Sequence, residues 1–262
     1  MAITTEAGLI AARASGRPSE IIKASLASTV AGQLFSLYRA AGTAPQQPVP
    51  PTTHVVCTNA TAGAIAPQFA MVGGNSLYID SISNQFAVAG QMRIVDRVIH
   101  GGGLSGTVLT AQAINTPALP DTITPARCRW FLEWYADTGA TASNATIAVT
   151  HTDATSANIV VAIGGTVRTG RKIELVPAAG KIIASVLQCT SLSASTGTAG
   201  NFGVTCQHYS GVKAGVLAAN TSIEYESLMR EMPRPDACLA AEILCSTIST
   251  GAVEGDIFLM QG

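Results

Sequence analysis

Apolar and polar positions alternate through most of the chain after Thr53, and this two-residue period predicts β-strands. The clearest alternation predicts a central strand from Arg127 to Tyr135, with Cys128, Trp130, Leu132 and Trp134 on an apolar face and Arg129, Phe131, Glu133 and Tyr135 on a mixed face. Similar runs predict strands at Val55–Thr58, Ser76–Ile82, Gln91–Ile99, Ala145–His151, Asn158–Ile163, Lys172–Val176, Ile182–Leu192, Phe202–His208 and Asp256–Met260. Gly, Asn, Ser and Thr separate these runs, as is typical of a sandwich or a barrel.

A different period occurs near the N-terminus, where apolar residues recur every three or four positions. Such spacing lines one face of a helix, and here it involves Ile22, Leu26, Val30, Leu34 and Leu37 or Tyr38. Ser19 can cap the start, and Gly42 followed by Pro45 can end it, so a helix is predicted over residues 19–41. Its opposite face has few charges, which suits either packing on a neighbouring protein or packing on the chain's own β body.

The segment from Gly42 to Thr53 reads GTAPQQPVPPTT and separates these two patterns. Its four prolines fix φ and remove backbone donors, so it is predicted to be a semi-rigid extended spacer. The predicted organisation is a helical arm over residues 1–42, a Pro-rich spacer over 43–53, and a β-sandwich or jelly-roll-like body over 54–262 that is long enough for two subdomains. Within the body, Thr221–Met232 has helical spacing and four charges, and predicts a short surface helix or a charged loop.

Charge changes this picture more than any motif does. Charged residues make up only 12% of the chain, against roughly 25% in an average soluble domain. The deficit is concentrated between Arg39 and Asp80, which has no charge, and between Glu174 and Lys213, which has only Lys181. We interpret both stretches as surfaces covered by partners. The alternative is that they are buried strands and Ser/Thr-rich loops of an ordinary β domain.

Several classes of function and location are disfavoured by composition. The net charge is −1 and the pI is near 6.4, which argues against direct nucleic-acid binding. No run of 18 apolar residues predicts a membrane span, and residues 1–17 do not resemble a secretory signal, so synthesis in a cytosol is expected. The cysteines have no CxxC pair and are predicted to be mostly buried apolar residues, at positions 57, 128, 189, 206, 238 and 245.

No catalytic, cofactor-binding or metal-binding constellation is predicted. The histidines at positions 54, 100, 151 and 208 form none of the usual metal-binding spacings. Cys206 and His208 would share a face of a strand, but we expect a core cysteine beside a polar histidine rather than a nucleophile and its base. The run from Gly101 to Gly106 has no following Lys-Ser/Thr, so it predicts a bend or a close approach between strands rather than a phosphate loop. Acids at positions 96, 137 and 153 are expected in solvated turns or beside arginines.

Four segments resemble a family encoded among the virion genes of tailed bacteriophages. They are MRIVDRVIHGGGLSGT at 92–107, RWFLEWYADTGATASNATIAVTHTD at 129–153, LSASTGTAGNFGVT at 192–205, and PDACLAAEILCSTISTGAVEGDIFLMQG at 235–262. The resemblance concerns sequence texture and order and covers most of residues 92–262. It implies a role as a virion component present in many copies, and no active site.

The resemblance therefore implies a non-enzymatic capsid decoration or cement protein on the virion surface, made in the host cytoplasm. Its expected partners are the major capsid protein and copies of itself. The predicted contacts of the arm are its apolar residues, Ile22, Leu26, Val30, Leu34 and Leu37. The alternatives are a neck or tail structural protein, a carbohydrate- or receptor-binding module, and a hydrolase. A carbohydrate module would need exposed aromatic rings, and a hydrolase would need two converging carboxylates.

Overall fold

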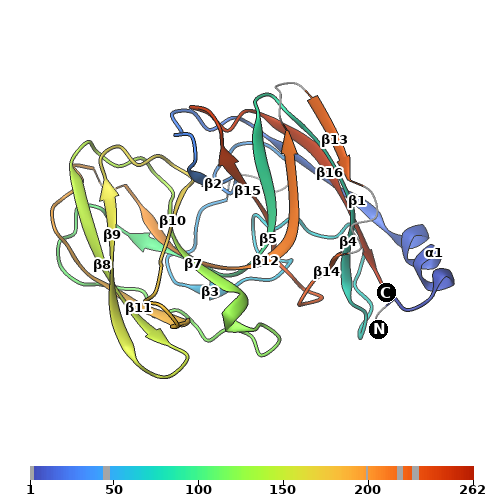
Figure 1. The fold of residues 1–262 in the computed structure, drawn as a ribbon, viewed down its shortest axis with the longest axis horizontal. Helices are drawn as coiled ribbons and strands as arrows, with labels where there is room; N and C mark the ends of the chain where they lie inside the picture. The colour runs from blue at the N-terminus through green and yellow to red at the C-terminus, as the bar shows by residue number, and fades with distance from the viewer. Residues whose placement is uncertain (1–2, 44–47, 199, 217–220, 226–229) are drawn as a thin grey trace. The chain divides into compact units, whose positions relative to one another are not determined.

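The chain is mainly β, as predicted, and its sheets are built from antiparallel pairs (Figure 1). The computed structural model describes residues 3–43, 48–198, 200–216, 221–225 and 230–262. Its helices are α1 (Glu6–Ser15) and the short 3-10 helix η1 (Pro125–Arg127). The strands are β1 (Arg17–Lys23), β2 (Leu34–Ser36), β3 (Val55–Val56), β4 (Leu77–Phe86), β5 (Gly90–Leu104), β6 (Gln112–Ala113), β7 (Cys128–Trp134), β8 (Ala142–His151), β9 (Ser156–Gly164), β10 (Arg171–Glu174), β11 (Ile183–Leu192), β12 (Phe202–Val216), β13 (Thr221–Tyr225), β14 (Arg230–Glu231), β15 (Leu239–Cys245) and β16 (Val253–Gln261).

Contacts divide the chain into two compact units, which are discontinuous in sequence. Unit 1 comprises Met1–Pro48, Thr58–Asp96 and Tyr209–Gly262, and unit 2 comprises Val49–Cys57 and Arg97–His208. The strands β5 and β12 contribute residues to both units. The segment predicted to be a separate arm is therefore part of unit 1 and joins its sheet through β1.

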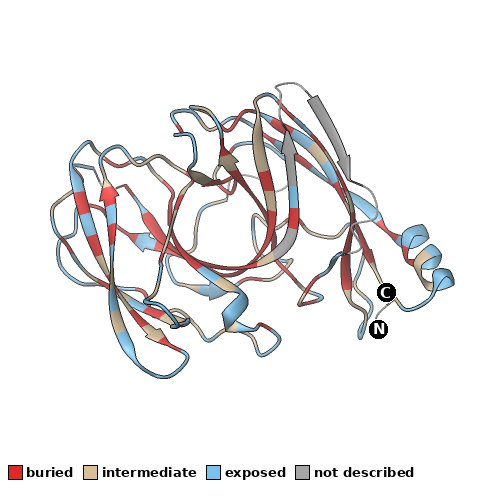
Figure 2. Cartoon of the chain, in the orientation of Figure 1, coloured by how far each residue is buried: buried red, intermediate tan, exposed pale blue. Residues whose placement is uncertain are grey.

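Unit 1 is organised around a sheet in the order β1-β16-β4-β13, with β14 also paired to β4. A second group of strands in this unit runs β2-β15-β5. Buried aliphatic and aromatic side chains from both groups form one core, which includes Ile21, Phe35, Phe86, Ile243 and Ile257. In Figure 2, β1 alternates between buried and exposed positions, as expected when one face of a sheet packs on a core, whereas β15 is buried along almost its whole length.

Unit 2 contains a four-stranded sheet in the order β6-β11-β8-β9 and a second group in which β7 lies between β10 and β12. The strand β7 confirms the central strand predicted from the alternation at Arg127–Tyr135. The apolar face of β7, Trp130, Leu132 and Trp134, lies in the core of this unit with inward residues of β8, β9 and β11. The Trp134 ring stacks on Phe202, with 5.3 Å between ring centroids. Burial of this face stabilises the unit, because aromatic and aliphatic side chains bury the largest apolar areas.

The helix predicted over residues 19–41 is wrong. Residues 17–23 form β1, which pairs with β16 from Arg17↔Leu259 to Lys23↔Val253. The burial period in β1 is two, because Ile21 is buried while Ile22 is exposed. Further along, Ser28 and Gly32 have φ values of 59° and 79°, in the left-handed region, which interrupts any continuous right-handed helix.

Gly42, predicted to end that helix, has another role. Its φ is 135°, and a Cβ at this position would lie 2.0 Å from the carbonyl oxygen of Ile22. The residues around it lie along the edge of β1, where Ala24 N donates to Ala41 O at 2.8 Å and Ile22 N donates to Thr43 O at 3.3 Å. Gly42 therefore permits the loop to lie against β1.

The N-terminal helix is short and precedes the predicted one. Thr5 caps α1 by accepting a hydrogen bond from Gly8 N at 3.0 Å. Ala12 packs with Tyr78 and Met260, and Arg13 pairs with Asp80 of β4 at 2.8 Å. The helix thus docks on the sheet of unit 1. Among the described residues, no helix has the length and apolarity that a bilayer crossing requires.

The segment Thr221–Met232 was predicted to be a short surface helix or a charged loop, and its described residues form neither a helix nor a single loop. Its described residues instead form β13, which pairs with β4 from Thr221↔Phe86 to Tyr225↔Ile82, and β14. Residues 226–229 lie outside the described part of the chain. Pairing with β4 overrides the local helical spacing, because strand formation depends on the neighbouring strands more than on the local sequence.

Candidate functional site

The mixed face of β7 carries a buried ionic cluster, which is the densest group of chemically active side chains in unit 2. Lys172 on β10 lies directly opposite Glu133 in the sheet, and Thr205 on β12 lies opposite Phe131. Arg97 and His100, both on β5, complete the cluster. All five polar members, Arg97, His100, Glu133, Lys172 and Thr205, are at most 3% exposed.

Glu133 is held by two partners. Arg97 Nη2 lies 3.1 Å from Glu133 Oε1, and Thr205 Oγ1 donates to Glu133 Oε2 at 2.7 Å. Both carboxylate oxygens therefore have a partner. This satisfies the hydrogen-bonding capacity of a charge that would otherwise be expensive to bury.

His100 lies beside this ion pair. Arg97 Nη1 is 3.0 Å from His100 Nδ1, and because a guanidinium only donates, this ring nitrogen acts as an acceptor. The Tyr135 hydroxyl lies 3.2 Å from the same nitrogen and 3.3 Å from Gly101 O. Lys172 Nζ donates to Gln207 Oε1 and lies 4.1 Å from the centroid of the Phe131 ring. Every charged group of the cluster thus has a partner of matching chemistry.

Burial and neighbouring charges fix the protonation states of the cluster. Burial alone would raise the pKa of Glu133, but Arg97, His100 and Lys172 together with the Thr205 hydrogen bond lower that pKa to about 2. Burial, reinforced by the Arg97 charge, holds the pKa of His100 well below its ordinary value. Burial also lowers the pKa of His54, whose Nε2 accepts from Val204 N at 3.3 Å, to about 4. At neutral pH, Glu133 is therefore ionised and both histidines are neutral.

This arrangement favours a structural role. A dissolved substrate would have to reach side chains that unit 2 encloses, and Glu133 already uses both oxygens on Arg97 and Thr205. A fully satisfied buried network holds the strands that carry it in one arrangement. The sequence indicated only Glu133 within a Trp-rich strand. Charged residues inside the strands predicted at 91–99 and 172–176 were the signal for its partners, but their pairing depends on strand order.

We expect unit 2 to lose stability on acidification in two stages. His54 has a folded pKa of about 4, below the ordinary value of 6.5, so the unfolded state binds the proton first and stability falls from pH 6.5 to 4. Glu133 adds a second loss from pH 4.5 to 2, because its folded pKa is the lower one. Each stage is expected to amount to roughly 2 to 3 kcal/mol.

Urea unfolding followed by tryptophan fluorescence measures this directly, because both tryptophans, Trp130 and Trp134, lie in unit 2. His54→Gln should make the first stage shallower by removing the contribution of His54, while the contribution of His100 and the second stage remain. A stability that stays constant from pH 6.5 to 4 in the unsubstituted chain would contradict the assignment of neutral His54 and His100.

The acidic residues singled out in the sequence all have basic partners. Asp96 forms a bidentate salt bridge with Arg234 in unit 1. Arg234 Nη2 donates to Asp96 Oδ1 at 2.7 Å, and Arg234 Nε donates to Asp96 Oδ2 at 3.0 Å. Asp137 pairs with Arg168 at 2.8 Å, and Asp153 pairs with Lys181 at 2.5 Å. The prediction of arginine partners is confirmed for Asp96 and Asp137. Among the described residues, no three His, Cys, Asp or Glu side chains gather as a metal site would require.

The Cys206–His208 pair and the glycine run lie inside strands. Cys206 is fully buried in the core of unit 2 and His208 is also buried. Five of the cysteines are buried and Cys128 is partly exposed, which confirms the prediction of buried apolar cysteines. Gly101–Gly103 lie within β5, and a Cβ on Gly203 of β12 would lie 1.8 Å from Gly101 O. The predicted close approach between strands is confirmed.

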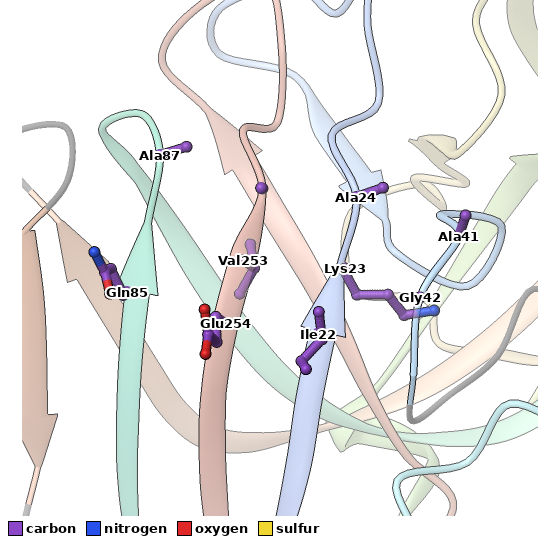
Figure 3. Close-up of a pocket in the computed structure, with 10 residues that line it drawn as sticks. Ile22, Lys23, Ala24, Ala41, Gly42, Gln85, Ala87, Val253 and Glu254 are labelled. Carbon is purple, nitrogen blue, oxygen red and sulfur yellow. The ribbon is translucent and has the colours of Figure 1, made fainter.

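Unit 1 contains a pocket of about 500 Å³ at the ends of β1, β4 and β16 (Figure 3). Ile22, Glu254 and Gln85 lie side by side across these strands and share one face of the sheet. Lys23 points to the loop side, where its Nζ donates to Ala40 O at 2.8 Å, and burial lowers its pKa to about 8. The rest of the lining is mostly small and apolar, so the pocket has the shape of a binding site without a set of converging reactive groups.

The five residues predicted as partner contacts of the arm do not share a face. Ile22 and Val30 are exposed, Leu37 is buried, and Leu26 packs against the core of unit 1. Leu34 is in β2, paired with Leu244. Their spacing was interpreted as helical, but the residues are spread over a strand, a loop and a second strand. Whether any of them contacts a partner stays a prediction.

The four-stranded sheet of unit 2 has an unusual composition. None of its strands, β6, β8, β9 and β11, contains Asp, Glu, Lys or Arg. Its inner face, including Ile147, Val149 and Val186, packs in the core, while the opposite face presents Asn144, Thr146, Asn158, Val160 and Ala162. Ion pairs occur only beyond the strand ends, at Asp153–Lys181 and Asp137–Arg168. The outer face, called here the uncharged face, lies partly within the charge-poor stretch predicted to be covered.

Neither tryptophan forms an exposed platform, since Trp130 is 2% and Trp134 0% exposed.

Comparisons of this chain with protein-family models, curated proteins and solved structures find no match. Its function is therefore proposed from its own residues and from the sequence resemblance of its four segments, described above.

Proposed function

We propose that this chain is a non-enzymatic structural protein of a tailed-bacteriophage virion, a decoration or cement subunit on the outer surface of the capsid. In this proposal, the two units are variants of a sandwich or jelly-roll-like body. The chain is made in the host cytoplasm and then binds to the particle. Its partners are the major capsid protein and copies of itself. The alternative is that the same kind of subunit is located in the neck or the tail of the virion.

The observation that carries the proposal is the uncharged face of unit 2. Exposed sheet faces of dispersed proteins normally carry interspersed charges, which keep them soluble. The four strands here carry none, and Val160 at the centre of β9 is 63% exposed. Assembly would cover such a face, because burying apolar and weakly polar surface favours association without the cost of desolvating charges.

We place the proposed adhesive contact on unit 2 rather than on the N-terminal segment. Residues 17–23 pair with β16 along their whole length, so removing residues 1–50 would take a strand out of unit 1. That deletion would report on folding rather than on binding. Charged substitutions on the uncharged face test adhesion more cleanly, because the side chains there point away from the core.

The cement role predicts that the bound chain raises the rupture temperature of the capsid. Many copies that bind the assembled shell, and not its dissociated subunits, stabilise it by mass action. Capsids stripped of this chain should rupture at a lower temperature than complete ones in a dye-release assay, and purified chain should restore the difference. The variant Ala148→Lys, on the uncharged face, should restore less. Full binding with no change in rupture temperature would contradict a cement role.

A further inference from the structure

The strand β9 is one of the two terminal strands of the sheet β6-β11-β8-β9, and it is the longer of the two. In the order β6-β11-β8-β9, β9 is terminal, and within the described residues it pairs only with β8. The pairing runs from Ala142↔Gly164 to Thr150↔Ser156 without a register shift. A long regular edge of this kind presents a row of open backbone donors and acceptors.

The β8–β9 hairpin determines which residues face the open edge. His151 N donates to Thr155 O at 2.8 Å and Ala154 N donates to His151 O at 3.0 Å, so His151 and Thr155 form the hydrogen-bonded pair that closes the turn. Hydrogen-bonded and non-hydrogen-bonded pairs alternate along an antiparallel ladder. Counting from this turn, the odd-numbered residues 157–163 bond to β8. The backbone groups of Ser156, Asn158, Val160, Ala162 and Gly164 therefore point outward.

β9 lacks the devices that usually protect an edge. Its sequence, SANIVVAIG, contains no charge, no proline and no bulge. The edge strand of unit 1 is a useful contrast within the same chain. There β1 has Arg17, Pro18 and Glu20, and the loop at Ala41–Thr43 hydrogen-bonds to it. The β1 edge therefore carries the protection that the β9 edge lacks.

We propose that β9 is the interface between two copies of this chain, which pair through antiparallel addition of β9 to β9. Placing Val160 opposite its own copy pairs Asn158 with Ala162 and Ser156 with Gly164, so every outward-pointing residue exchanges backbone hydrogen bonds. The result is a continuous eight-stranded sheet, four strands from each copy, with a two-fold axis at Val160.

The distribution of charge indicates both which partner pairs with β9 and how the two paired strands are oriented. The β9 edge has no charged side chains, so it offers no electrostatic complementarity to a charged partner. It is complementary to a second, equally uncharged copy of itself. The antiparallel arrangement places the Asp153 end of one strand near the Arg168 end of the other. A parallel arrangement would instead bring each Asp153 beside its own copy, which is repulsive. This inference deepens the proposed function, on which it rests for its biological setting, by naming the self-association surface.

Sedimentation velocity of the purified chain and four variants tests the proposal. The unsubstituted chain should be a dimer. Val160→Pro removes the outward N–H and should give a monomer, as should Val160→Lys, which adds a charge at the axis and guards against a folding defect in the proline variant. Val160→Thr keeps both the backbone and the β-branch, and should remain a dimer. Thr146→Lys, opposite Val160 on β8, charges the same face but leaves the edge intact, so it should also remain a dimer.

An independent measurement is oxidative cross-linking. Residues in a hydrogen-bonded antiparallel pair have Cα atoms about 5.5 Å apart, within disulfide range, so Val160→Cys should form a covalent dimer. Thr146→Cys should not, because two copies of β8 would be separated by three strand spacings, about 14 Å. The unsubstituted chain supplies the background from its native cysteines.

A monomeric unsubstituted chain, or a Val160→Pro variant that is still a dimer, would overturn the proposal. Loss of the dimer in Thr146→Lys alone would overturn it too, in favour of stacking between uncharged faces. These outcomes are separate from the virion role. A monomer that is nevertheless found on particles would leave the proposed function intact, and a β9 dimer that is absent from particles would remove the virion role but keep this interface.

Discussion

Replacing Glu133 with Gln should destabilise unit 2 by roughly 3 to 5 kcal/mol, because it leaves the Arg97 guanidinium buried without its counter-charge. Lys172, also buried, lies opposite residue 133 and adds to the positive charge that remains. A loss of this size is a large part of the total stability of a typical domain. Urea unfolding followed by the two tryptophans in unit 2 measures it.

Glu174→Gln is the matched control. It makes the same chemical change on β10, but Glu174 pairs with Arg129 at 3.4 Å in a setting where both side chains are well exposed. Exposed pairs contribute about 0 to 1 kcal/mol, so this variant should be nearly neutral. The double variant Glu133→Leu with Arg97→Met should recover part of the loss, because it removes both charges. Equal effects of Glu133→Gln and Glu174→Gln would show that the buried cluster does not stabilise the unit.

Replacing Gly203 with Ala should destabilise the chain by about 3 kcal/mol or more. The added Cβ would lie 1.8 Å from Gly101 O and 2.5 Å from Gly102 Cα, both of them backbone atoms that no rotamer change can move. The strands β5 and β12 would have to separate. Gly203 also lies opposite Glu133 in the sheet, so separation would disturb the ionic cluster.

Gly90→Ala provides the control for this substitution. Gly90 begins β5, and a Cβ there would meet nothing closer than 3.6 Å. It should be neutral or slightly stabilising, since Ala is less costly to order than Gly. Thermal unfolding of both variants gives the comparison. A Gly203→Ala variant as stable as Gly90→Ala would mean that the close approach of β5 and β12 is not a constraint on this fold.

The sequence predicted the strands well where the alternation of apolar residues was long or the run was β-branched. The strand at 128–134 and the nine other observed strands that match predicted runs were identified from period and turn residues. The segment at 19–41 failed for a specific reason. Ile21 and Ile22 are adjacent, and only one of them faces the core, so choosing Ile22 as the buried residue turned a two-residue period into an apparent helical one.

The ionic cluster could be predicted only in part, because its members are distant in sequence. Arg97 and Glu133 are 36 positions apart, and Thr205 is 72 positions from Glu133. Local pattern places each residue on a strand but does not say which strands are neighbours. The open edge of β9 could not be predicted for the same reason. The sequence SANIVVAIG predicts a strand, whereas its terminal position in the sheet follows from the pairing of β8 with both β9 and β11.

We propose that this chain assembles on a virion through surfaces that lack charge. Electron cryomicroscopy of the purified particle, at a resolution sufficient to trace this chain, tests it most directly. We expect many copies on the outer surface of the capsid, with the uncharged sheet of β6, β8, β9 and β11 covered by a capsid subunit or a second copy. A particle without this chain, or one in which that sheet faces solvent while charged surfaces make the contacts, would contradict the claim.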